Sequence, residues 1–258
     1  MPSPLTTADP RRAYASATRS EVAVLLIHGF TSIPGALFEW AAGLESAGYD
    51  VSVPLLEGHG TRWEDLAATR HPAWLRQVEK EYDRLRSTHR QVVVAGMSMG
   101  GALALHVAAV RHPAAVLLVN PAVHGLPPLA RFARVLAPIM PTTAPVADDI
   151  ARSGVSEGAY ELTPTAGVAS LRALQRHVRQ ELSGVIAPVT LFRSDVDHVV
   201  PAASVRALLA GLTPDARLRL RRVALHRSFH VATLDHDAPL ILEASLRAIE
   251  EATDGGAA

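Results

Sequence analysis

The chain has 258 residues, of which 48% are hydrophobic, and its 25 Lys and Arg residues balance its 25 Asp and Glu residues. This balance gives no electrostatic reason to expect nucleic acid or a strongly acidic partner. The chain has no cysteine, which excludes disulfide bonds, thiolate metal sites and a cysteine nucleophile.

The first stretch of the chain, residues 1–21, is polar and rich in Pro, Ser and Thr. It lacks the apolar run of a secretory signal, and the apolar residues 22–27 that follow are too few to cross a bilayer. We therefore expect a flexible N-terminal segment over residues 1–20 and a cytoplasmic protein.

Short apolar runs then alternate with helical patterns up to residue 121. The runs lack polar alternation, which is typical of strands buried on both faces of a parallel sheet. This order predicts an α/β fold with a mostly parallel, doubly wound sheet, whose reactive residues lie at the carboxyl ends of the strands. The predicted strands are residues 22–27, 49–53, 91–95 and 114–119, and the predicted helices are residues 36–47, 72–88 and 102–110.

The alternation stops between residues 122 and 184, where prolines are frequent and short helical patterns occur over residues 128–137 and 165–182. A long irregular loop is unusual inside a compact domain, so we predict an inserted helical cap over residues 122–184. The αβ pattern then resumes, with strands at 188–193 and 217–223 and helices at 202–212 and 238–252. The predicted α/β core is therefore residues 21–121 and 185–252, followed by a tail at 253–258.

Ser98 lies in the sequence GMSMG, residues 96–100, between a predicted strand and a predicted helix. This strand–turn–helix context places a nucleophilic serine at the apex of a tight turn, where the glycines leave room for neighbouring backbone. The hydroxyl would lie at the positive end of the helix. The five-residue pattern also fits a glycine-rich turn with an idle serine, so other segments must support the assignment.

A serine hydroxyl near neutral pH needs a histidine base, which in turn is oriented by a carboxylate. In hydrolases of this topology, the acid and then the base follow late strands. Asp195 and Asp197 follow one such strand, and we favour Asp197 because Asp195 is placed to cap the turn. His226 and His230 follow the next strand, and we favour His230 because a small apolar turn leads from it to the last helix.

The oxyanion of an acyl-transfer intermediate needs two N–H donors. One is expected from the backbone N–H of Met99, directly after the nucleophile. The other is expected from the loop after the first strand, and we assign it to the backbone N–H of Phe30.

A metal site is the alternative interpretation of the two late histidines. His226 and His230 stand four residues apart and would chelate a metal on a helix. They follow a predicted strand instead, and neither a third ligand at metal-site spacing nor a cysteine accompanies them. We therefore expect neither a metal nor a cofactor.

Taken together, the motifs resemble those of bacterial carboxylesterases and monoacylglycerol lipases of the α/β-hydrolase superfamily. The similarity extends over residues 22–249 and is weakest over residues 122–154 of the cap. The last two similar segments, with AYELTP at 159–164, look most like bacterial monoacylglycerol lipases. In chain order the similar segments are LIHGFTS (26–32), GHGT (58–61), GMSMGG (96–101), SDVDHVVP (194–201) and SFHVATLD (228–235).

The resemblance implies that Asp197 is the catalytic acid and His230 the base. It implies that the N–H groups of Phe30 and Met99 form the oxyanion hole. It also implies that Asn120 and Glu157 are polar features near the alcohol part of the substrate.

The activity implied by the resemblance is hydrolysis of carboxylic esters, foremost monoacylglycerols, to fatty acid and glycerol through an acyl-enzyme on Ser98. A small lipid ester is thus the expected partner. The apolar stretch 126–140 would either touch a lipid surface transiently or simply cover the site. The alternatives are a general carboxylesterase, an acyltransferase or thioesterase on the same scaffold, and a catalytically silent ligand-binding protein.

Overall fold

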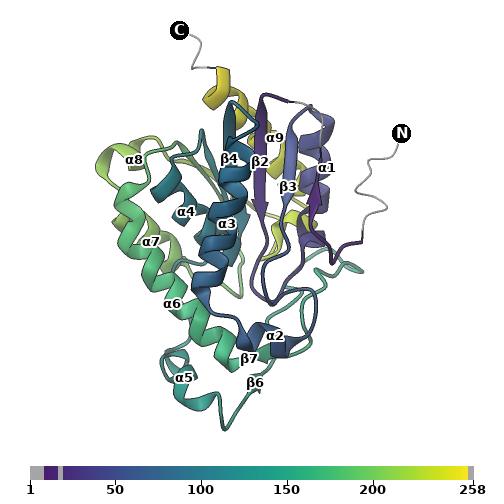
Figure 1. The fold of residues 1–258 in the computed structure, drawn as a ribbon, viewed down its shortest axis with the longest axis vertical. Helices are drawn as coiled ribbons and strands as arrows, with labels where there is room; N and C mark the ends of the chain where they lie inside the picture. The colour runs from purple at the N-terminus through teal and green to yellow at the C-terminus, as the bar shows by residue number, and fades with distance from the viewer. Residues whose placement is uncertain (1–8, 17–19, 255–258) are drawn as a thin grey trace.

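The computed structural model describes residues 9–16 and 20–254 (Figure 1). A seven-stranded sheet forms its centre, with the strand order β1-β3-β2-β4-β5-β8-β9. The edge strand β1 pairs antiparallel with β3, and the other neighbouring pairs are parallel. This confirms the predicted α/β class. The strands are β1 (Tyr14–Ala15), β2 (Val22–Ile27), β3 (Asp50–Val53), β4 (Gln91–Met97), β5 (Val116–Val119), β8 (Val189–Ser194) and β9 (Arg221–Leu225).

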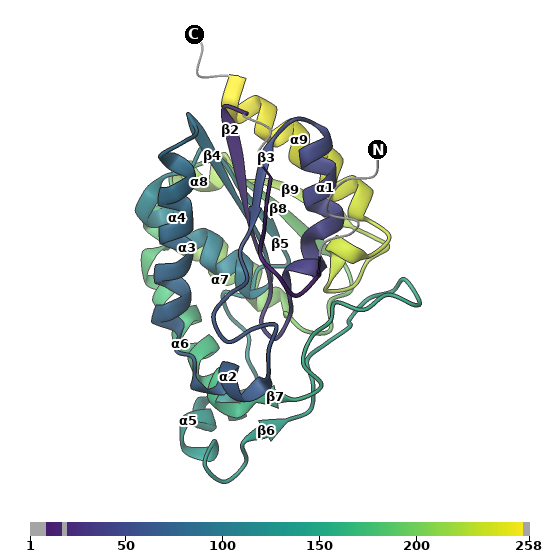
Figure 2. The same cartoon turned by 45° about the vertical axis from the view of Figure 1, so that its right-hand side comes forward.

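Helices cover both faces of this sheet (Figure 2). Helices α3, α4 and α6 lie on one face, and α1 and α9 lie on the other. The helices are α1 (Phe38–Ser46), α2 (Trp63–Ala68), α3 (His71–Arg86), α4 (Met99–Arg111), α5 (Ala133–Leu136), α6 (Thr165–Glu181), α7 (Ala202–Gly211), α8 (Pro214–Leu218) and α9 (Ala238–Asp254). Short 3-10 turns are η2 (Pro34–Leu37), η3 (Pro128–Phe132), η4 (Leu182–Gly184) and η5 (Ala232–Leu234).

The continuous apolar runs of the sequence become strands buried from both sides. In β2, Val24 and Leu26 pack into the core beneath α1 and α9, whereas Leu25 and Ile27 pack into the core beneath α3 and α4. Successive strand residues point to opposite faces of a sheet. A strand between two helical layers therefore needs apolar side chains at every position.

Residues 122–184 connect β5 to β8 and carry η3, α5, the small antiparallel pair β6 (Thr142–Thr143) and β7 (Thr163–Pro164), and α6. We call this segment the cap, and its front part hangs below the sheet in Figure 1. Helix α6 runs from the cap into the layer of α3 and α4. Its buried residues Leu171, Leu174 and Val178 belong to the core on that face.

The structure differs from the predicted elements at the edges. Tyr14 and Ala15, inside the segment expected to be flexible, pair with β3. The Tyr14 hydroxyl donates to Glu45 Oε1 at 2.8 Å, which fixes this short strand. Helix α2 was not predicted at all.

Near the C-terminus, α8 occupies part of the strand predicted over residues 217–223. Thr213 caps this helix by accepting a hydrogen bond from the N–H of Ala216, and Pro214 occupies its first position, where proline is well tolerated. The strand β9 consequently starts at Arg221.

Helix α9 continues to Asp254, beyond the predicted start of the tail. The other residues of that tail, 255–258, and residues 1–8 and 17–19 lie outside the described residues. Within residues 9–16 and 20–254, no helix has both the length and the apolar character that crossing a bilayer requires.

Candidate active site

Ser98 forms a sharp turn between β4 and α4. Its backbone has φ 55° and ψ −118°, a combination that is strained for a residue with a side chain. The flanking glycines make the turn sterically feasible. A Cβ on Gly96 would collide with the carbonyl of Gly100, and a Cβ on Gly100 would collide with the carbonyl oxygen of Ile27.

Backbone hydrogen bonds hold this strained turn in place. The N–H of Ser98 donates to the carbonyl of Val119 at the end of β5. The carbonyl of Ser98 accepts hydrogen bonds from the N–H groups of Gly101 and Ala122. The turn is therefore tied to both neighbouring elements, and the serine side chain is presented to the pocket described below.

Asp197 and His230 form a buried pair. Asp197 Oδ1 lies 3.0 Å from His230 Nδ1, and the side chains are 0% and 6% exposed. Asp197 follows β8, and His230 lies in the loop after β9. This contact places Nδ1 of the imidazole against the carboxylate, so Nε2 is the ring nitrogen left to exchange a proton, as a serine hydrolase requires.

Asp197 is further fixed by three donors. Its Oδ1 accepts the N–H groups of Val199 and Val200, and its Oδ2 accepts from Arg193 Nη1. Burial alone raises the pKa of Asp197. The hydrogen bond and charge of His230, the N–H of Val200 and the charge of Arg193 outweigh burial and hold the pKa below its ordinary value. The carboxylate thus stays ionised beside the imidazole.

The competing residues Asp195 and His226 form their own pair. His226 Nδ1 lies 2.6 Å from Asp195 Oδ2, and the two side chains are 71% and 58% exposed. Because His226 faces solvent whereas His230 is buried against Asp197, the two histidines do not converge on a common metal position.

The two backbone donors expected for the oxyanion hole flank the serine. Met99 is the first residue of α4, so its N–H has no acceptor in a preceding turn. Phe30 lines the same pocket as Ser98. In the described part of the chain, the N–H of Phe30 donates to no protein acceptor.

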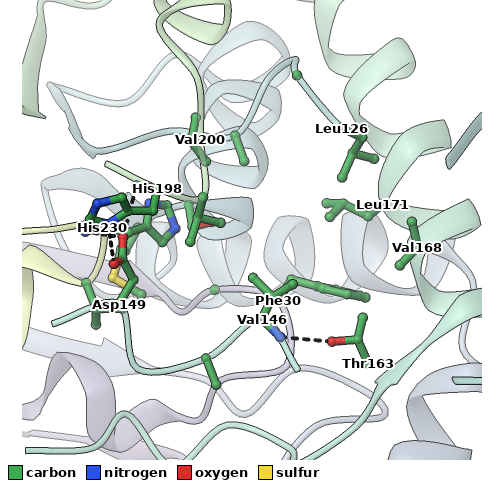
Figure 3. Close-up of a pocket in the computed structure, with 18 of the residues that line it drawn as sticks. Phe30, Leu126, Val146, Asp149, Thr163, Val168, Leu171, His198, Val200 and His230 are labelled. Carbon is green, nitrogen blue, oxygen red and sulfur yellow. Dashed lines mark hydrogen bonds and ion pairs between the residues drawn. The ribbon is translucent and has the colours of Figure 1, made fainter. Parts of the chain in front are cut away.

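Ser98 and His230 open into one pocket of about 490 Å³ (Figure 3). Its size falls in the range of small-molecule sites. The histidine end is polar, with His198 and Asp149 beside His230. The opposite end is apolar and is formed by Phe30, Leu126, Val168 and Leu171.

Comparisons with known proteins show the family of the chain. The profile of the serine aminopeptidase S33 family (Hydrolase_4) matches residues 18–161. A thermostable monoacylglycerol lipase from Bacillus sp. (strain H-257) is 36% identical over 232 residues, which cover 89% of this chain and 91% of the relative. The chain belongs to the serine aminopeptidase S33 family. It is a serine hydrolase with the α/β-hydrolase fold, as the resemblance predicted.

Other S33-like and α/β-hydrolase proteins are also similar to the chain. A carboxylesterase from Bacillus subtilis (strain 168) is 24% identical over 244 residues, covering 85% of this chain and 88% of the relative. A solved structure from work on the metagenome-derived lipolytic enzymes LipS and LipT superposes with a TM-score of 0.88 at 30% identity, covering 94% and 98% of the two chains. A monoglyceride lipase from Saccharomyces cerevisiae has the same fold, with a TM-score of 0.74 at 14% identity. The superposition covers 93% of this chain and 89% of that structure.

Asn120 of this S33 hydrolase contacts the loop that carries His230. It is fully buried and does not line the pocket. Its Nδ2 donates to the carbonyl of His230 at 2.8 Å and to Ser194 Oγ at 2.9 Å, and its Oδ1 accepts the N–H of Ser194 at 3.0 Å. Asn120 therefore holds the histidine loop against the end of β8 and acts on the site through that loop.

Glu157 does line the pocket and is only 6% exposed. Its Oε1 accepts the N–H of Asp148, and its own N–H donates to Asp148 Oδ1. Burial raises the pKa of Glu157, while the nearby His230 charge opposes the rise. The hydrolase thus has a second buried carboxyl on the cap side of its site.

Sequence reasoning missed Asp149. Its Oδ2 accepts the N–H groups of His198 and His230, and its Oδ1 lies 2.7 Å from His198 Nδ1. The carbonyl of Asp149 also accepts the N–H of Val231. This residue joins the cap to both catalytic loops. Because its partners are 49 to 82 residues away along the chain, no local pattern could reveal them.

Proposed function

We propose that this chain hydrolyses monoacylglycerols through an acyl-enzyme on Ser98. The observation that carries the proposal is a strained serine and a buried Asp197–His230 pair that open into one half-apolar pocket. The 36% sequence identity to a monoacylglycerol lipase, over most of both chains, supports this choice of substrate.

The proposed reaction follows from the positions of these groups. Ser98 Oγ attacks the ester carbonyl carbon while His230 Nε2 accepts its proton, and Asp197 stabilises the imidazolium. The N–H groups of Phe30 and Met99 hold the oxyanion. The ester C–O bond then breaks as His230 returns the proton to the glycerol oxygen. Water, activated by His230, releases the fatty acid and restores the serine.

The two ends of the pocket suggest how the substrate lies. The apolar wall from Phe30 to Leu126 and Leu171 suits an acyl chain. Glu157, on the cap, is placed to accept hydrogen bonds from glycerol hydroxyls near His230. We infer that the cap, residues 122–184, determines which ester fits.

The tip of the cap supports transient contact with a lipid surface. It exposes large apolar side chains, and an exposed apolar patch often marks an interaction site. Arg131 stacks over Phe132, 4.6 Å from the ring centroid, which adds a cation suited to anionic headgroups. The exposed side chains are Leu129, Phe132, Val135, Ile139 and Met140.

A substrate panel tests the proposal. Monoacylglycerols and simple p-nitrophenyl esters of graded chain length are compared at equal concentration. We expect monoacylglycerol turnover that falls on the order of 10⁶-fold in Ser98→Ala, as in other triads. Turnover of short p-nitrophenyl esters with no monoacylglycerol hydrolysis would contradict the proposed substrate and favour a general carboxylesterase.

A further inference from the structure

A second cavity, of about 190 Å³, adjoins the catalytic pocket. Since a water molecule occupies roughly 30 Å³ in the liquid, the cavity has room for a carboxylate group and its hydration. No carboxylate side chain lines it. It is lined by residues 124–128 and Arg131 of the cap and by Arg172, Gln175, Arg176 and Arg179 of α6.

The periodicity of α6 concentrates positive charge in this cavity. Arg172, Arg176 and Arg179 recur at spacings of four and three, so they share one face of the helix. Like charges at this spacing destabilise an isolated helix. Arg131 from η3 adds a fourth guanidinium. All three line the same cavity, and burial, followed by the charges of Arg176 and Arg172, lowers the pKa of Arg179.

In the part of the chain that the structure describes, no acidic side chain neutralises these arginines. Arg179 Nη1 donates to the carbonyl of Val123 at 2.8 Å, and Arg131 stacks on Phe132. Across residues 9–16 and 20–254, none of the four cavity arginines lies within ion-pair distance of a carboxylate. By contrast, Arg84 and Arg111 on the opposite end of the helix layer each contact acidic side chains.

The cavity lies at the apolar end of the catalytic pocket. The two cavities share the wall formed by residues 124–127 and by Gln175 of α6. In Figure 3, Leu126 of this shared wall lies across the pocket from His230. An acyl chain that reacts at Ser98 and extends along the apolar wall therefore points its far end towards the arginines.

We propose that the arginine cavity binds a carboxylate at the far end of an apolar chain lying in the catalytic pocket. The hydrolase would then accept monoesters of dicarboxylic acids, converting ester and water to the dicarboxylate and the alcohol. A free fatty acid would bind in the reverse direction, with its carboxylate at the arginines and its tail towards Ser98, and inhibit. This inference rests on the proposed esterase function.

The test compares p-nitrophenyl monoesters of adipic, suberic and sebacic acid with neutral p-nitrophenyl esters of the same acyl length. The double variant R172Q/R176Q removes two cavity charges, and R76Q/R206Q removes two exposed charges from α3 and α7 as the matched control. At the best length, kcat/KM for the charged ester should fall about tenfold in R172Q/R176Q only, since a hydrogen bond to a charged group is lost. The neutral ester should keep its kcat/KM.

Octanoate distinguishes the two sources of carboxylate. Competitive inhibition of neutral-ester hydrolysis by octanoate, weaker in R172Q/R176Q and in high salt, shows that a free fatty acid occupies the cavity. A preference of the wild type for the charged over the neutral ester, lost in R172Q/R176Q, shows that the carboxylate of a substrate occupies the cavity. If the double variant folds poorly, both measurements are made on Arg131→Gln, which removes a cavity charge at an exposed position of the cap.

Two outcomes would overturn the inference. One is that R172Q/R176Q loses kcat/KM equally for the charged and the neutral esters. The other is that the ratio of kcat/KM for charged to neutral esters stays unchanged in this variant and octanoate inhibits it as strongly as the wild type. Both assume that the wild-type protein hydrolyses the neutral ester. Absence of that hydrolysis would instead overturn the proposed esterase function.

Discussion

At the scale of single residues, Asn120 illustrates how a buried amide can shape the site without lining the pocket. Its side chain joins the carbonyl of His230 to Ser194. The sequence placed Asn120 after a strand but could not show its direction, because its φ of 44° turns the chain at that point. The partners Asp197 and His230, in contrast, were predicted from their order after two strands, and the structure pairs them.

Asn120→Ala should lower kcat for monoacylglycerol by tenfold to about a hundredfold, since small displacements of a catalytic base have large effects. KM should change little, because Asn120 does not line the pocket. Steady-state kinetics, together with urea unfolding to correct for lost stability, provide the measurement. A raised KM at unchanged kcat would restore Asn120 as a substrate contact.

His28 gives a prediction about acid stability. It is fully buried, its Nε2 accepts the N–H of Leu56 at 3.1 Å, and burial lowers its pKa to about 4. The unfolded chain, with the ordinary histidine pKa of 6.5, binds this proton more readily. The contribution of His28 is therefore fully present above pH 6.5 and is lost as the pH falls towards 4, by about 3 kcal/mol.

In His28→Gln, the amide oxygen can accept the Leu56 N–H without titrating. The free energy of unfolding of this variant should fall less steeply than that of the wild type between pH 6.5 and pH 4. Urea unfolding across this range is the measurement. Parallel pH dependences for the two proteins would show that His28 is not the group responsible.

At the scale of secondary-structure elements, the buried strands and amphipathic helices were predictable because their patterns are local. Residues 22–27 became β2 and residues 72–88 became α3 almost as expected. The predicted strand at 217–223 was wrong in part. Thr213 and Pro214 favour the start of helix α8, which occupies residues up to Leu218. The contacts of Asp149 were beyond prediction because the front of the cap has little regular structure.

The cap tip should matter for substrate presented on a surface. Ile139→Asp places a charge on an apolar side chain that is 84% exposed, and Leu218→Asp does so at 86% exposure on α8. We expect Ile139→Asp to reduce turnover of monoacylglycerol in anionic vesicles several-fold, because burying apolar surface in lipid drives such contacts. Hydrolysis of a dissolved short ester should be unchanged.

The control Leu218→Asp should leave both activities unchanged. Vesicle sedimentation followed by assay measures binding and turnover in the same samples. Equal vesicle turnover in Ile139→Asp and the wild type would remove the cap tip from any role at a lipid surface.

At the scale of the whole molecule, the parallel sheet collects residues distant in sequence at one edge. Ser98 follows β4, Asp197 follows β8 and His230 follows β9. Residues of the cap line the pocket at this edge, and α6 packs against the core through Leu171, Leu174 and Val178. Under the proposed function, the chemistry takes place at the strand ends and the inserted segment selects the substrate.

The central claim is that Ser98 is the nucleophile of an acyl-transfer site. The most direct measurement is labelling of the folded protein with a fluorophosphonate, followed by mass spectrometry of its peptides. The account predicts stoichiometric modification of Ser98, slowed in His230→Ala and absent in Ser98→Ala. A folded wild-type protein that stays unlabelled, or that carries the label on another serine, would contradict it.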